Sequence, residues 1–145
     1  MTPAGTSPRA AAAPPRMGDQ VFPARPDQVR EARKFLRAAL EGCPAADDAI
    51  LCISELAANS CLHSASREAS GTFTVRAEIH EGDYVWIEVE DSGGPWNQRA
   101  HPDGRPHGLD IVRAYAADWG IDGDPLTGWI AWAKLNWLPA NGTAR

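Results

Sequence analysis

The sequence is poor in lysine and in long apolar runs, and each shortage argues against a class of protein. Only two of the 145 residues are lysine, against twelve arginines, and the formal net charge is −5. Because nucleic-acid binding usually depends on clustered Lys and Arg, this acidic balance argues against a DNA or RNA backbone as the main partner. No apolar run approaches the roughly 18 residues of a membrane span, and the N-terminus lacks the apolar block of a secretory signal. We therefore expect a cytoplasmic protein with no membrane partner.

Cysteine is also scarce, and its spacing excludes the common paired arrangements. The three cysteines are Cys43, Cys52 and Cys61, an odd number without any C-x-x-C pair. These spacings do not suit a zinc site or a disulfide framework. The sequence therefore predicts reduced, mostly buried thiols.

The length fits one domain with a single core. Residues 1–18 are rich in Ala, Pro, Gly, Ser and Thr and show no apolar periodicity, which predicts a disordered tail. We place the domain at 19–139 and a short C-terminal tail at 140–145.

Apolar periodicity predicts strands grouped beside helices, which indicates an α+β fold, a two-layer α/β sandwich. A proline-tolerant edge strand is expected at 20–23 and a hairpin at 72–90. The expected elements, in order, are strand 20–23, a helix from Pro26 to about Glu41, helix 47–63, strands 72–80 and 84–90, a helix from Gly108, strand 119–121 and strand 129–138.

The predicted helix 47–63 carries a row of polar side chains opposite an apolar stripe. Glu55, Asn59 and His63 are spaced at i, i+4 and i+8, so they share one side of the helix. Asp48 and Cys52 fall near the same line, whereas the core-facing stripe comprises Ile50, Ile53, Ala57 and Cys61. Taken alone, such a row also fits a solvated helix face.

Two further motifs follow along the chain. Asp91-Ser92-Gly93-Gly94 comes at a strand end, and His107-Gly108-Leu109-Asp110-Ile111-Val112 opens a helix. Each motif alone is common, and Asp91 could merely end a strand, His107 could be a loop residue and His63 a surface histidine. The three motifs in this order and structural context are specific.

With these three motifs the chain resembles the GHKL ATPase superfamily, which includes gyrase, Hsp90, MutL and histidine kinases. It is most similar to the small bacterial anti-sigma-factor serine/threonine kinases, since we expect neither a transducer domain nor a phospho-accepting helical hairpin in this sequence. The resemblance covers about Val21 to Leu138. It implies a mixed, mostly antiparallel sheet packed against helices.

The resemblance also implies roles for individual residues, with ATP and Mg²⁺ as cofactors. Glu55 would activate the nucleophile, and Asn59 would hold the magnesium ion. Asp91 would accept a hydrogen bond from the adenine amino group. The remaining predicted nucleotide-binding residues are His63, Gly93, His107, Gly108 and Leu109.

These roles agree with elementary chemistry. Magnesium prefers oxygen ligands and keeps several waters, so one amide oxygen beside phosphates is a sensible site. A helix N-terminus next to a glycine suits an anion. A carboxylate one turn from the metal ligand suits proton transfer from a serine hydroxyl, because phosphoryl transfer depends on positioning and charge neutralisation.

Two positions depart from the family pattern. Pro106 replaces a glycine before Gly108, and proline has no N–H to offer a phosphate. Ile130 stands where a threonine is expected, unless Thr127 substitutes for it.

The function that the resemblance implies is an anti-sigma factor that binds ATP and phosphorylates a serine of an anti-anti-sigma, STAS-type antagonist. A sigma factor would be the second protein partner, with no direct nucleic-acid contact, and a homodimer is left open. The alternative is a GHKL-fold partner-binding module with little or no catalysis, which Pro106 and Ile130 favour.

Overall fold

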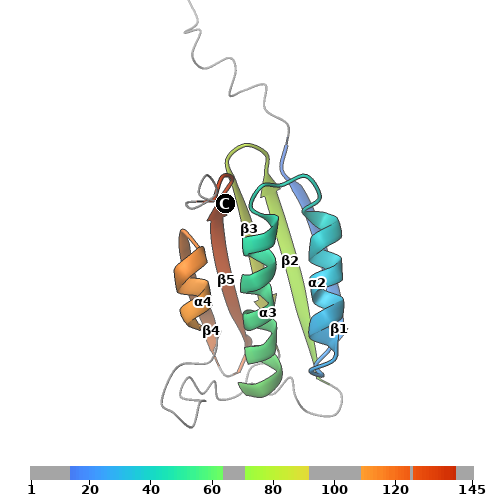
Figure 1. Ribbon diagram of the computed structural model, residues 1–145. Helices are drawn as coiled ribbons and strands as arrows, with labels where there is room; N and C mark the ends of the chain where they lie inside the picture. The colour runs from blue at the N-terminus through green and yellow to red at the C-terminus, as the bar shows by residue number, and fades with distance from the viewer. Residues whose placement is uncertain (1–13, 64–70, 92–108, 125, 140–145) are drawn as a thin grey trace, which may run out of the picture.

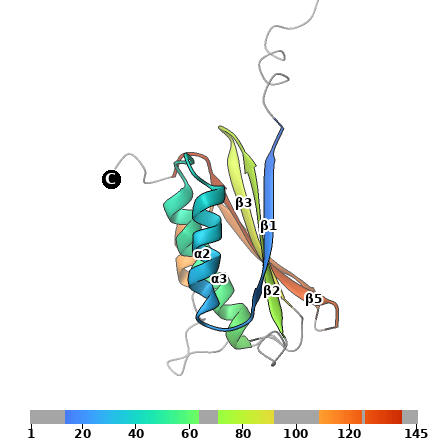
Figure 2. The same ribbon diagram turned by 90° about the vertical axis from the view of Figure 1, so that its right-hand side faces the viewer.

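A computed structural model describes residues 14–63, 71–91, 109–124 and 126–139, and within them three helices cover one face of a five-stranded sheet (Figure 1 and Figure 2). The strand order is β1-β2-β3-β5-β4, and all four described pairings are antiparallel. The elements are β1 (Arg16–Pro23), α2 (Gln28–Ala39), α3 (Ala46–His63), β2 (Thr72–His80), β3 (Tyr84–Glu90), α4 (Leu109–Tyr115), β4 (Asp118–Asp124) and β5 (Gly128–Asn136). The α+β sandwich is confirmed, with an antiparallel sheet where a mixed one was expected.

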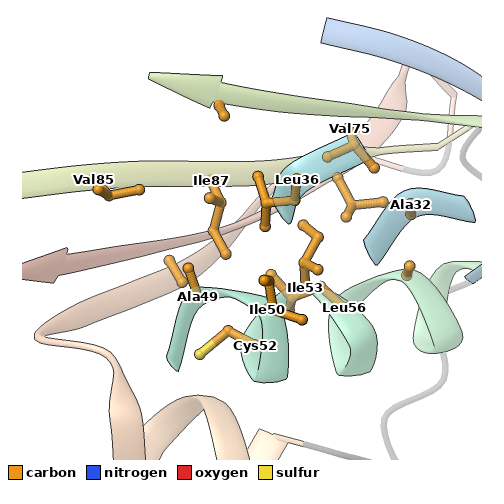
Figure 3. Packing of buried hydrophobic residues seen from close by; sticks show 14 of the residues in the cluster. Ala32, Leu36, Ala49, Ile50, Cys52, Ile53, Leu56, Val75, Val85 and Ile87 are labelled. Atoms are coloured by element: carbon orange, nitrogen blue, oxygen red, sulfur yellow. The ribbon is translucent and has the colours of Figure 1, made fainter. Parts of the chain in front are cut away.

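The core lies between the sheet and the helices. Every second side chain of β2 and β3 is buried, as the alternating sequence predicts. Figure 3 shows Val75, Val85 and Ile87 of the sheet facing Leu36 of α2 and Ile53 of α3. Burying a side chain of this size contributes about 1.5–3 kcal/mol, so this layer fixes the position of α3 against the sheet.

Several element boundaries differ from the sequence-based expectations, and those of β1 and β4 differ most. β1 begins at Arg16, so residues 16–18 are not part of the predicted tail but pair with residues 77–79 of β2. Backbone hydrogen bonding to β2 extends this edge strand, although its side chains show no apolar pattern. β4 runs over Asp118–Asp124 and not only 119–121, because backbone pairing with β5 extends it. Its aspartates are tolerated in the strand because they lie at an exposed edge of the sheet.

Helix α3 is buried over more of its circumference than the predicted stripe. The stripe residues Ile50, Ile53, Ala57 and Cys61 are buried as expected. Asp48, Cys52 and Asn59 are buried as well, at 5%, 0% and 2% exposure. The reason is that α3 contacts α2 on one side and α4 on the other as well as the sheet beneath it. A single-helix pattern cannot reveal these neighbours.

The prediction of buried, reduced thiols is confirmed, since all three cysteines are free and buried. Burial, with smaller contributions from Asp48 and Glu55, raises the pKa of the Cys52 thiol to about 12. Burial likewise raises the pKa of Cys61 to about 11. Among the described residues, no helix combines the length and apolarity needed to cross a membrane.

Candidate functional site

Asp91 is the residue on which three elements meet. It follows β3 and is only 8% exposed. Its Oδ2 accepts a hydrogen bond from the Ser60 hydroxyl of α3 at 2.9 Å, and its Oδ1 accepts one from the Trp129 N–H of β5 at 3.2 Å. Its own N–H donates to the Trp129 carbonyl at 2.9 Å. These two hydrogen bonds fix the orientation of the carboxylate group.

Gly128 makes this arrangement possible. Its φ of +120° is a conformation that L side chains rarely adopt. A Cβ at this position would lie 2.6 Å from the Asp91 carbonyl oxygen. The start of β5 can therefore approach Asp91 closely only because residue 128 is glycine.

Sequence reasoning missed Ser60 and the part played by Gly128. Ser60 directly follows Asn59 and is 2% exposed, and a small hydroxyl among the apolar residues of a buried helix was the available signal. For Gly128 the signal was a glycine immediately before an aromatic-rich strand.

Ile130 and Thr127 do not affect Asp91. Ile130 pairs with Glu90 and Asp122, on the sheet face opposite the helices. Thr127 lies between β4 and β5, where its N–H donates to Asp124 Oδ1 at 2.8 Å. The main chain of Trp129 makes the contacts to Asp91, so the expected loss of a hydroxyl at position 130 does not alter the carboxylate's surroundings.

Asn59 and Glu55 lie one turn apart on α3 in different surroundings. Asn59 is buried next to Ser60, and hence next to the residue that holds Asp91. Glu55 is half-buried and lines an open groove of about 350 Å³ between α2 and α3. The groove is also lined by the guanidinium of Arg33 and the hydroxyl of Ser54; its other lining residues are Pro26, Val29, Ala58 and the buried Cys61.

Some predicted site residues are placed only in part. Leu109 is the first residue of α4 and is 3% exposed, so its side chain packs in the interior. His63 is the last residue of α3, and the structure does not describe its side chain. Gly93, His107 and Gly108, together with Pro106, lie outside the described residues.

The donor set limits what could hold a metal ion. Among the described residues no group of three or more His, Cys, Asp or Glu side chains could bind one. The predicted magnesium ligand, Asn59, offers a single amide oxygen. This chemistry fits a magnesium ion that arrives with phosphates and keeps its waters, and it does not fit an all-protein cage.

Comparison with solved structures shows the same fold in proteins of low sequence identity. The RsbU and RsbW domains of Rv1364c from Mycobacterium tuberculosis match with a TM-score of 0.63 and 23% identity. The histidine kinase domain of the blue-light-activated histidine kinase from Erythrobacter litoralis EL346 matches with a TM-score of 0.52 and 19% identity. These matches cover 86% and 84% of this chain, but only 33% and 64% of those chains.

Sequence comparison is more specific about the family. No curated protein matches the chain. Residues 22–126 match the histidine kinase-like ATPase domain, a range that includes Glu55, Asn59 and Asp91 and implies ATP binding. The predicted membership of the GHKL superfamily is thereby confirmed: the chain belongs to the family of histidine kinase-like ATPase domains.

Proposed function

We propose that this chain is an anti-sigma factor with ATP-dependent serine/threonine kinase activity. It would phosphorylate a serine of an anti-anti-sigma, STAS-type protein and thereby regulate a sigma factor. The observation that carries the proposal is the arrangement along α3. Ser60, which follows Asn59 on the helix, holds the Asp91 carboxylate, while Glu55, one turn before Asn59, lines a groove. The fold shared with a structure that contains an RsbW domain supports the same function.

Asp91 would recognise adenine. Its carboxylate is held by the Ser60 hydroxyl and the Trp129 N–H, so it is oriented before any ligand arrives. A hydrogen bond from the adenine amino group to this charged acceptor would contribute about 1.5–3 kcal/mol. Because the carboxylate is almost buried, little water competes for the bond.

Asn59 would offer its amide oxygen to a magnesium ion bound by the ATP phosphates. When bound, the ion neutralises the charge that develops on the transferred phosphoryl group. Leu109 begins α4, and the N–H groups of positions 108 and 109 would contact the phosphates, as the family motif implies.

Glu55 would act as the general base. A serine Oγ of the antagonist attacks the γ-phosphorus, the bond from that phosphorus to ADP breaks, and the serine proton passes to the Glu55 carboxylate. Glu55 lines an open groove, so a hydroxyl from a separate protein can reach it. The phosphoserine formed adds negative charge to the antagonist, which would change its binding.

The test is transfer of labelled phosphate from Mg-ATP to candidate antagonist proteins encoded near this chain. We expect one antagonist to be labelled on serine and to lose binding to the phosphorylating chain. If no antagonist is labelled while a sigma factor still binds, the kinase proposal fails and the partner-binding module without catalysis takes its place.

A further inference from the structure

The sheet face opposite the helices is uncovered in the described residues, and it carries an unusual set of side chains (Figure 2). We call it the outer sheet face and define it by the residues that alternate with the buried ones. These are Met17, Asp19, Val21, Pro23, Thr72, Thr74, Arg76, Glu78, His80, Tyr84, Trp86, Glu88, Glu90, Asp118, Gly120, Asp122, Asp124, Ile130, Trp132, Lys134 and Asn136. None of them is needed for the nucleotide site described above.

Two indole rings form the centre of the outer sheet face. Trp86 and Trp132 stack with ring centroids 4.5 Å apart and an interplanar angle of 10°. The Trp86 N–H donates to Glu88 Oε1 at 2.9 Å, and the Trp132 N–H donates to Asp122 Oδ2 at 3.1 Å. A Cβ at Gly120 would lie 2.8 Å from the Trp132 ring, so the glycine lets that ring lie across β4. Both rings are therefore held in fixed positions.

A hollow of about 190 Å³ adjoins the Trp86 ring on the β1 side. Met17 and Trp86 supply its apolar wall, and Asp19, Glu78 and Glu88 supply carboxylates. The cation within it, Arg76, is already engaged, with Nη1 at 2.8 Å from Glu88 and 2.7 Å from Glu90. Met17 is 73% exposed, and Val21 on the same strand is 58% exposed, so large apolar side chains reach the solvent beside this hollow.

The outer sheet face is strongly acidic. Its side chains include seven carboxylates against two permanent cations, Arg76 and Lys134, a balance of −5, in a chain whose formal net charge is also −5. Two such faces would repel each other, which argues against a second copy of this chain as the occupant. An anionic phosphate backbone or lipid surface is disfavoured for the same reason.

We propose that the outer sheet face docks a protein segment that presents arginine side chains. A guanidinium fits the hollow because it stacks on an indole face, contacts a thioether and forms two-pronged hydrogen bonds with carboxylates. Trp86 and Asp19 would provide these contacts around one guanidinium. Glu78 would add its Oε2, because its Oε1 already contacts His80 Nε2 at 2.6 Å. The surface lies on the opposite side of the sheet from Glu55 and Asp91, so the proposal does not depend on the proposed kinase activity.

The experiment uses the full chain and a short Ser-Gly-Arg repeat peptide with three arginines. The control peptide carries citrulline in place of each arginine, which keeps the shape and removes the charge. Binding is followed by ¹H–¹⁵N NMR on the indole N–H signals of Trp86 and Trp132, assigned with Trp86→Phe and Trp132→Phe. We expect saturable shifts at these two signals with the arginine peptide and at least tenfold weaker binding of the citrulline peptide.

A matched pair of charge variants locates the surface. Asp19→Asn with Glu78→Gln removes two carboxylates from the outer sheet face, and it should weaken binding about two- to thirtyfold. Glu41→Gln with Asp47→Asn removes the same charge from the exposed helix side and should change binding less than twofold.

Three results would overturn the proposal. Equal weakening by the two double variants would indicate only attraction to the net charge. Equal binding of the citrulline peptide would show that no guanidinium is recognised. If sedimentation detects a dimer of the wild-type chain, and Met17→Glu dissociates it, the surface binds a second copy of the chain.

Discussion

The two flanks of α3 differ in accessibility, and this difference separates binding from transfer. On the flank that reaches Asp91, Ser60 is 2% exposed. On the flank that faces α2, Glu55 and its neighbours border an open groove. The buried flank can hold a carboxylate in one orientation for a small ligand, and the open flank can admit a second protein. One helix thus serves two tasks that need opposite solvent exposure.

The comparison predicts that mutations on the two flanks affect different measurements. Changes around Asp91 should alter nucleotide affinity or stability, because those groups are buried and mutually bonded. Changes at Glu55 should alter the rate of transfer alone.

The largest expected effect is at Glu55. Glu55→Ala should lower phosphotransfer to the antagonist by about 10²–10⁴-fold, the usual contribution of a general base. ATP affinity should remain within about twofold, since a carboxylate near phosphates contributes no evident binding energy. Glu41→Ala, an exposed carboxylate outside the groove, is the control for loss of charge. Full transfer by Glu55→Ala would show that the open flank does not perform the chemistry.

The next effect is on stability at Gly128. Gly128→Ala should reduce the free energy of unfolding by about 2–5 kcal/mol, because alanine is strained at φ +120° and its Cβ meets the Asp91 carbonyl. Gly82→Ala is the matched control: its φ is +80° but nothing lies within 4 Å of the added Cβ. That variant should lose only about 1–2 kcal/mol in urea unfolding. An equal loss of unfolding free energy in Gly128→Ala and Gly82→Ala would mean that the close contact of residue 128 with Asp91 does not affect stability.

Asp91→Asn tests adenine recognition on the buried flank. The amide keeps one acceptor but loses the charge, so ATP affinity should fall by about one to two orders of magnitude. Ser60→Ala, which removes a donor to Asp91 and leaves the carboxylate, should cause a smaller loss in the same calorimetric titration. Unchanged binding by Asp91→Asn would place the adenine elsewhere.

The smallest effect concerns the buried Cys52 on the same helix. Its folded-state pKa of about 12 exceeds the reference value of 9.0, so the folded state favours the neutral thiol. The unfolded thiol ionises first, and stability is therefore lost as pH rises from about 9 toward 12. Between pH 8 and 10 the wild type should lose about 1 kcal/mol more than Cys52→Ala, measured by urea unfolding at each pH. If the free energy of unfolding changes with pH in the same way for the wild type and Cys52→Ala, the burial of Cys52 does not have this effect.

The sequence predicted the elements whose side chains alternate or repeat on one face. Strands 72–80 and 84–90 are found with the predicted bounds, and helix 47–63 begins one residue earlier at Ala46. β1 and β4 were predicted too short, because hydrogen bonds to neighbouring strands extend them and their own side chains are mostly polar. Periodicity reports the burial of side chains, and it carries no information on backbone pairing.

For the candidate site, the sequence predicted where Asp91 lies in the fold but not which residues contact it, and the roles assigned to the site residues stay predictions. The order of the motifs placed Asp91 at the end of a strand, where the structure has it. Its bonds to Ser60 and Trp129 join positions 31 and 38 residues away, which local spacing cannot reveal. The burial of Asn59 depends in the same way on the packing of α3 against its neighbours.

The central claim is that Asp91 and its surroundings form an ATP site, and calorimetry with Mg-ATP tests it most directly. We predict saturable heat with one nucleotide per chain and a dissociation constant below one millimolar, weakened at least tenfold by Asp91→Asn. Absence of heat from the folded wild-type chain at millimolar Mg-ATP would contradict the account.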